Sequence, residues 1–401
     1  MKKYLIMMLC FLLLISGCTK SSDGSSVAEP PMEEAEEVVP ALSPEEMAEL
    51  ERQAEETRLA QEVEDALKHL TLEEKVGQLF FAACPATDAP SAVTQYHLGG
   101  ILLFTRDYQD ISGNWLTAET FAEKISSLQT AAQDDTGISL FIGSDEEGGT
   151  VTRASRNPNL FESKFPSPQT LYQTEGLEGL LIKTTSFNEQ LLSYGVNVNF
   201  APVCDISTHS TDFIYDRSFG QDAAATADYI SQVVTAMGSA GVGSVLKHFP
   251  GYGSNVDTHT GIAMDTRPYE QFTAEDYLPF LSGIDAGAPF VLVSHNIVTC
   301  LDEAYPASLS PAWHVQLRSH LGFDGIILTD DLNMGAVQSY AKEGNIAVLA
   351  LQAGNDMIVT TDFEQQISTI LDAVENGTLS EDIINNACRR VLTGKQRLHL
   401  L

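Results

Sequence analysis

Positive charge is scarce in this chain of 401 residues, which has 22 lysines and arginines against 55 aspartates and glutamates. The formal net charge is −33 at pH 7. A chain this acidic repels the phosphate backbone of nucleic acids, so we expect no nucleic-acid partner. The same charge says little about a neutral substrate.

Other features are missing as well. After the first sixteen residues no apolar run is long enough to cross a bilayer. No G-x-G-x-x-G follows an apolar run, which argues against a dinucleotide-binding protein. The cysteines beyond residue 18 are widely scattered and form no C-x-x-C pair, so we interpret them as small buried side chains rather than disulfides. They are Cys84, Cys204, Cys300 and Cys388.

The N-terminus has the pattern of an export signal. Lys2 and Lys3 precede an apolar stretch at 4–15 that is short for a transmembrane helix but typical of a signal peptide. The Ile-Ser-Gly-Cys sequence that ends at Cys18 resembles the lipobox of bacterial lipoproteins. This resemblance implies lipidation of Cys18 and an exported protein on the extracytoplasmic face of the bacterial cell membrane. An ordinary secretion signal with a chance cysteine is the alternative.

Four segments follow from the pattern of the chain. Residues 1–17 are the expected signal peptide, and 18–42, rich in Ser, Glu, Pro and Ala, are interpreted as a flexible acidic tether. Ser43-Pro44-Glu45-Glu46 has the residues of a capping box and predicts a charged helix over 43–69. Residues 70–401 form the expected catalytic domain. A second capping box at its start predicts a helix that carries Val76, Leu79 and Phe80.

Within 70–401, short apolar runs alternate with amphipathic stretches. Runs this short and apolar are typical of strands buried on both faces of a parallel sheet. Repeated strand–helix units favour a single α/β domain, a (β/α)8 TIM-type barrel, over an open doubly wound sheet. The expected strands are 100–104, 139–143, 196–203, 243–249, 290–293, 325–328 and 356–359, and the expected helices are 118–132, 177–194, 223–239, 311–321 and 363–375.

Charged or imidazole side chains end or directly follow five of these strands. In a closed barrel the C-terminal ends of the strands surround one opening, where such enzymes place their active sites. A single residue of this kind could be a charged side chain in a solvated loop. Such residues at the ends of five strands together indicate an active site. The residues are Asp145 with Glu146, Asp205, Lys247 with His248, His295, and Asp330 with Asp331.

The densest group of reactive residues lies at 247–259. Asp257 and His259 are two residues apart, so in an extended backbone their side chains leave on the same face. A carboxylate beside an imidazole fixes the tautomer and favours the protonated ring, as a general acid requires. A surface loop with incidental charges is one alternative. A zinc site that includes His248 is another, but the spacing matches no established zinc pattern, so we expect no metal and no other cofactor.

Several segments resemble a known enzyme family. Lys-His-Phe-Pro-Gly followed by Asp-x-His resembles the signature loop of family-3 glycoside hydrolases, in particular the β-N-acetylglucosaminidase branch. Residues 327–334 resemble the nucleophile strand of the family, and 145–153 resemble its sugar-binding segment. Two further blocks, 196–206 and 216–220, are similar to the family in the same order, and the similarity runs from about residue 70 to the C-terminus.

The resemblance implies a role for each matching residue. Asp330 would be the nucleophile, His259 the acid/base and Asp257 its partner. Retaining hydrolysis needs a carboxylate below the anomeric carbon and a proton donor near the leaving oxygen. Most glycosidases use a second carboxylic acid as the donor, whereas a histidine is known in this branch. The sugar would be held by Asp145, Arg153, Arg217, Lys247 and His248.

Three residues depart from the family pattern. Glu146, Thr150 and Tyr252 stand where glutamine, arginine and histidine are common, which puts the preference for the leaving group in doubt. Asp331 follows the implied nucleophile directly. We expect its side chain to leave on the opposite face and to have a structural role.

The resemblance implies a monomeric, retaining exo-β-N-acetylglucosaminidase that acts on peptidoglycan fragments or related amino-sugar glycans. A family-3 β-glucosidase or xylosidase is the first alternative. Those enzymes usually take their acid/base from a second domain, for which we expect no room after residue 392. A phosphorylase with the same dyad is the second alternative. From another class, a non-catalytic surface lipoprotein that binds sugars, or a solute receptor, would not need Asp330, Asp257 and His259.

Overall fold

The computed structural model describes residues 43–254, 263–338, 340 and 346–401. The predictions for Cys18, the tether, Asp257 and His259 therefore lie outside the described residues. The chain divides into two compact units, Met1–Arg52 and Gln53–Leu401.

Helix α1 (Pro44–His69) begins at the first predicted capping box. The Ser43 N–H donates to the Glu46 carboxylate at 2.9 Å, and the Glu46 N–H donates to the Ser43 hydroxyl at 3.2 Å. The second predicted box also forms: the Glu74 N–H donates to the Thr71 hydroxyl at 3.2 Å at the start of α2.

The unit from Gln53 onward is built on one parallel sheet of eight strands, in the order β10-β1-β2-β3-β4-β5-β7-β9. Leu328 in β9 pairs in parallel with Met357, just before β10, which brings the two ends of the sheet together. This closure confirms the predicted TIM-type barrel. The strands are β1 (Phe80–Ala83), β2 (Gly100–Leu103), β3 (Phe141–Ser144), β4 (Val198–Asn199), β5 (Gly243–Phe249), β7 (Phe290–Val293), β9 (Ile326–Thr329) and β10 (Ile358–Thr360).

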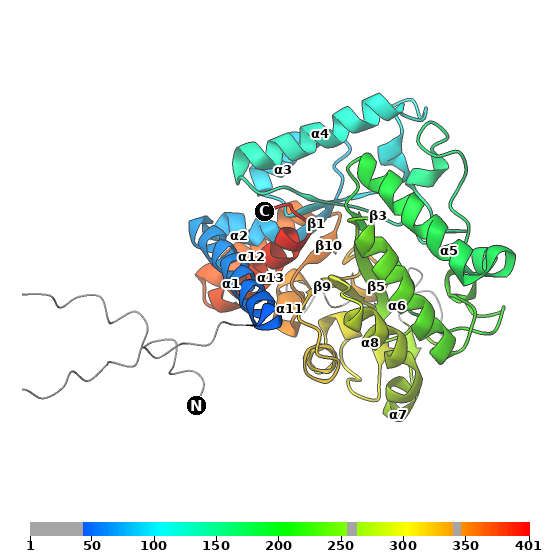
Figure 1. The fold of residues 1–401 in the computed structure, drawn as a ribbon. Coiled ribbons are helices and arrows are strands. Elements are labelled where there is room, and N and C mark those ends of the chain that lie inside the picture. Colours follow the sequence, from blue (N-terminus) through cyan, green and yellow to red (C-terminus); the bar gives the residue numbers. More distant parts are fainter. Residues whose placement is uncertain (1–42, 255–262, 339, 341–345) are drawn as a thin grey trace, which may run out of the picture. The chain divides into compact units, whose positions relative to one another are not determined.

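Helices follow the strands and surround the sheet (Figure 1). A separate two-stranded parallel sheet, β6 (Met264–Asp265) and β8 (Ile297–Val298), is built from residues that follow β5 and β7. The helices are α2 (Leu72–Gln78), α3 (Ala89–Tyr96), α4 (Ala118–Asp135), α5 (Pro168–Ser193), α6 (Ala223–Ser239), α7 (Tyr269–Gln271), α8 (Tyr277–Asp285), α9 (Pro311–Val315), α10 (Gly335–Gln338), α11 (Ile346–Ala353), α12 (Phe363–Glu375) and α13 (Glu381–Arg397).

Aromatic side chains fill the interior of the barrel. Phe81 and Phe200 meet edge to face with 5.1 Å between ring centroids, and Phe141 and Phe290 pack in the same way at 5.1 Å. Gly143 lies against these rings, where a Cβ atom would come within 2.7 Å of both Phe81 and Phe200. The interior is therefore a packed core.

One predicted element is wrong. The sequence predicted a helix that includes Leu79 and Phe80, but α2 ends at Gln78 and Phe80 begins strand β1. The apolar run at 79–84 fits a buried strand as well as a buried helix, and periodicity does not separate the two. Pairing decides the outcome, because β1 lies between β10 and β2 in the closed sheet.

Two further observations concern the described residues alone. None of their helices combines the length and the apolar character needed to cross a membrane. Cys84, Cys204 and Cys388 are buried free thiols, as the sequence predicted, and Cys300 is a partly buried one.

Candidate active site

A cavity of about 280 Å³ opens among residues at the C-terminal ends of the barrel strands. Its lining includes six of the side chains to which the resemblance gives a role, although they come from four separate segments of the chain. Their chemical roles remain predictions. The six are Asp145, Arg153, Arg217, Lys247, His248 and Asp330.

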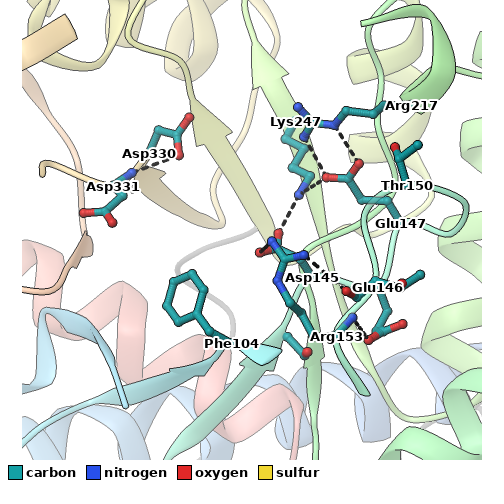
Figure 2. Close-up of polar contacts among 12 residues, drawn as sticks. Phe104, Asp145, Glu146, Glu147, Thr150, Arg153, Arg217, Lys247, Asp330 and Asp331 are labelled. Carbon is teal, nitrogen blue, oxygen red and sulfur yellow. Dashed lines mark hydrogen bonds and ion pairs between the residues drawn. The ribbon is translucent and has the colours of Figure 1, made fainter. Parts of the chain in front are cut away.

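A network of buried charges occupies one side of this cavity (Figure 2). The Lys247 ammonium lies 2.9 Å from the Asp145 carboxylate and 2.6 Å from the Glu147 carboxylate. Arg217 donates to both Glu147 oxygens, at 2.7 and 2.8 Å. Only 1% of the Glu147 side chain and 3% of the Lys247 side chain is exposed. Buried charges persist only when they are paired in this way.

The surroundings keep these groups ionised. Burial acts to raise the pKa of Glu147, but the positive charges of Arg217 and Lys247 outweigh it and hold that pKa well below its ordinary value. For Lys247, burial acts to lower the pKa, but Asp145 and Glu147 raise it overall. At neutral pH Glu147 is therefore ionised, and Lys247 and Arg217 are both cations.

Asp145 is one of two members of this network that stay partly accessible, with 17% of its side chain exposed against 15% for Arg217. Lys247 contacts one of its oxygens, and the Arg153 guanidinium lies 3.5 Å from the other. Two cations thus fix the direction of the carboxylate, which has further lone pairs to accept from hydroxyl groups.

His248 is oriented from both sides of its ring. Nδ1 lies 2.7 Å from the buried Asp205 carboxylate, and Nε2 lies 3.1 Å from a guanidinium nitrogen of Arg217. Because arginine only donates, this arrangement selects the tautomer with the proton on Nδ1. The other Asp205 oxygen accepts from the Tyr252 N–H at 2.7 Å, which ties the chain after β5 to the same carboxylate.

Asp330 follows β9 directly and lines the cavity apart from the charged network (Figure 2). Its own N–H donates to the Val293 carbonyl at 3.1 Å, and its carboxylate accepts from the Asp331 N–H at 2.9 Å. Asp331 also lines the cavity, but its carboxylate accepts from the Asn333 N–H at 2.9 Å, and the two carboxyl groups point away from each other. The structural role expected for Asp331 stays a prediction.

The sequence motifs predict no role for Glu147, which holds Lys247 and Arg217 together. A spacing signal was available, because Glu147 is two residues after Asp145 and extended residues two apart share a face. Asp205, the partner of His248, was predicted only as an acidic residue that follows a strand, and its contact with the imidazole was not predicted. In the part of the chain that the structure describes, no group of three His, Cys, Asp or Glu side chains could hold a metal ion.

Comparisons with known proteins identify the family of the chain. Residues 71–394 match the family model described as the glycosyl hydrolase family 3 N terminal domain. The chain is 31% identical over 341 residues to beta-hexosaminidase LpqI of Mycobacterium tuberculosis, which covers 81% of this chain and 83% of that protein. It is 30% identical over 329 residues to a beta-hexosaminidase of Hydrogenovibrio crunogenus, which covers 77% of this chain and 87% of that protein.

Some relatives are much longer than the part that aligns with this chain. The chain spans 54% of beta-hexosaminidase A of Pseudoalteromonas piscicida, with 28% identity over 335 residues. A family 3 beta-N-acetylglucosaminidase structure from Paenibacillus sp. FPU-7 superposes with a TM-score of 0.76 and 31% identity, over 82% of this chain and 63% of that one. A beta-N-acetylhexosaminidase structure from Beutenbergia cavernae gives 0.72 and 28%, over 82% of this chain and 99% of that one.

These matches confirm the resemblance that the sequence motifs indicated, including the branch of the family. They cover the barrel and every described residue that lines the cavity. The chain belongs to glycoside hydrolase family 3.

Proposed function

We propose that the protein is a retaining exo-β-N-acetylglucosaminidase that releases terminal β-linked N-acetylglucosamine from peptidoglycan fragments or related amino-sugar glycans. The observation that carries the proposal is one cavity in which Asp330 is present together with the network of Asp145, Glu147 and Lys247. The names of the relatives, beta-hexosaminidase and beta-N-acetylglucosaminidase, support the choice of sugar.

The size of the cavity supports exo action. At about 280 Å³, with Phe200 and Leu292 among its lining residues, it suits one terminal sugar ring better than a chain running through a groove. Asp145 would accept from sugar hydroxyls, while Lys247 and Arg153 would donate to hydroxyl oxygens.

The proposed reaction has two steps. The Asp330 carboxylate attacks the anomeric carbon, and the bond to the leaving oxygen breaks as His259 gives that oxygen a proton. This leaves a glycosyl-aspartate ester. In the second step His259 takes a proton from water, the water oxygen attacks the anomeric carbon, and Asp330 departs as a carboxylate. Asp257 would hold the His259 ring and favour its protonated form in the first step.

The function is tested by measuring turnover of three chromogenic substrates, with and without phosphate. The substrates are a β-N-acetylglucosaminide, a β-glucoside and a β-xyloside. We expect turnover of the N-acetylglucosaminide in preference to the other two, with free N-acetylglucosamine as the product in either buffer. Preference for the glucoside would contradict the substrate assignment. A sugar phosphate as the main product would show a phosphorylase.

We further propose that the protein is exported and anchored on the extracytoplasmic face of the cell membrane through lipid on Cys18. The support is the short apolar stretch at 4–15 behind Lys2 and Lys3. Replacing Cys18 with alanine should release the protein from the membrane fraction or block its processing, because the thiol is the attachment point. Unchanged fractionation and unchanged mass of the mature protein would refute the anchor.

A further inference from the structure

Glu146 lies between Asp145 and Glu147 in the sequence, but its side chain does not line the cavity. The side chain is buried, with 1% of the residue exposed. Its backbone is fixed to the barrel: the Glu146 N–H donates to the Asn199 side chain at 3.1 Å, and that side chain donates to the Glu146 carbonyl at 3.2 Å. Asn199 ends strand β4. The position of Glu146 is therefore set by the sheet.

Three donors converge on the Glu146 carboxylate. One oxygen accepts from the backbone N–H groups of Arg153 and Ser155, the latter at 3.3 Å, and the other oxygen accepts from the Ser155 hydroxyl at 2.8 Å. The Ser155 hydroxyl oxygen in turn accepts from the Phe165 N–H at 3.1 Å. This set suits a carboxylate, which only accepts. A glutamine here would offer one accepting oxygen and would direct its NH₂ group at Ser155.

These contacts reach the cavity through Arg153. The Arg153 backbone is held by Glu146, and its guanidinium lies 3.5 Å from Asp145. The carboxylate of Glu146 thus connects the rigid end of β4 to a cation that orients Asp145.

We propose that Glu146 is a positioning residue for sugar binding: its carboxylate, acting through Arg153, sets how firmly the site holds the sugar. The inference rests on the proposed function. Glu146 acts through Arg153 and does not touch the substrate.

Burial raises the pKa of Glu146 to about 7, although its hydrogen bonds to Arg153 and Ser155 act to lower it. The donors favour the ionised form, so the ionised carboxylate should hold Arg153 more firmly than the protonated acid does. Sugar affinity should then fall as the pH falls through about 7. The charged and titratable groups near Glu146 are Asp145, Glu147, Arg153, Tyr108 on the 3-10 turn after β2, Arg217 before α6, and Tyr229 on α6.

Stability should change with pH in the opposite direction. Between the ordinary pKa of 4.5 and about 7 the folded protein keeps a proton on Glu146 that the unfolded chain has lost. The stabilisation from the neutral acid is therefore fully present below pH 4.5 and is lost as the pH rises to about 7. A structural role alone would produce this change in stability without the change in affinity.

Glu146→Gln separates the two effects. Binding of N-acetylglucosamine is measured by calorimetry from pH 5.5 to 8.5, and the melting temperature is measured at pH 5 and pH 8. For the unmodified protein we expect the Kd to rise roughly threefold to tenfold as the pH falls across this range, the effect of one weakened hydrogen bond. Glu146→Gln should remove that part of the pH dependence. It should also raise the melting temperature at pH 8 and change it little at pH 5.

Asp276→Asn is the matched control. Burial also raises the pKa of Asp276 to about 7, but this carboxylate pairs with Arg267 and does not line the cavity. It should leave the pH dependence of the Kd as in the unmodified protein. If the Kd of Glu146→Gln follows the unmodified protein at every pH while the melting temperature changes, Glu146 is merely structural and the inference is wrong. If the unmodified protein binds no N-acetylglucosamine at any pH, the proposed function fails, and this inference fails with it.

Discussion

Replacing Asp330 with alanine should lower kcat by roughly ten-thousandfold or more, because the variant has no carboxylate to attack the anomeric carbon. The fold should survive, since Asp330 lies beyond the end of β9 and lines a cavity instead of the packed core. Hydrolysis of a chromogenic β-N-acetylglucosaminide gives kcat, and the melting temperature and circular dichroism report the fold.

Asp331→Ala is the matched control for this change, because it removes a neighbouring carboxylate that accepts from the Asn333 N–H. It should lower kcat far less than Asp330→Ala does. Equal losses in the two variants, with both folds intact, would contradict the assignment of Asp330 as nucleophile.

His259→Ala should have the second-largest effect, and that effect should depend on the leaving group. A general acid contributes typically about a hundredfold to ten-thousandfold in rate. Glycosides with poor leaving groups need this proton and should lose activity across that range. Nitrophenyl glycosides need little protonation, so their first step should be nearly unaffected. A series of aryl glycosides of increasing phenol pKa measures the dependence on the leaving group directly.

Asp257→Asn tests the same step without removing the ring. It should produce a related but smaller dependence on the leaving group, because the charge that favours the protonated imidazole is lost. If kcat/KM, which reports the first step, falls equally for all leaving groups in His259→Ala and the fold is intact, the acid role of His259 is wrong. Loss of activity on treatment with a chelator would instead indicate a metal site.

The barrel could be predicted because its signals are local. Short apolar runs such as 100–104 and 290–293 correspond closely to strands β2 and β7, and the acidic residues that follow the strands converge at their C-terminal ends. Strand β1 could not be predicted in this way, because Leu79 and Phe80 continue an apolar pattern that begins in a helix. Its pairing partners, β10 and β2, lie elsewhere in the chain.

In the candidate site, too, some features could be predicted from the local sequence, whereas others depend on the fold. The motifs identified the residue types that line the cavity, but not which of them bind each other. The partners of Glu147 come from two other segments, at Arg217 and Lys247, and only the closed sheet brings the three together. Glu146 illustrates the limit most clearly: the sequence places it in a motif, but only the contacts to Arg153 and Ser155 show what its side chain does.

The central claim is that Asp330 forms a covalent bond to the sugar, and the most direct measurement is the mass of the trapped intermediate. A fluorinated β-N-acetylglucosaminide with a good leaving group slows the second step more than the first, so the glycosyl-enzyme should accumulate. Peptide mapping by mass spectrometry should then find one sugar on Asp330. An adduct on Asp331 or Asp145, or inactivation with no adduct on any carboxylate, would contradict the account.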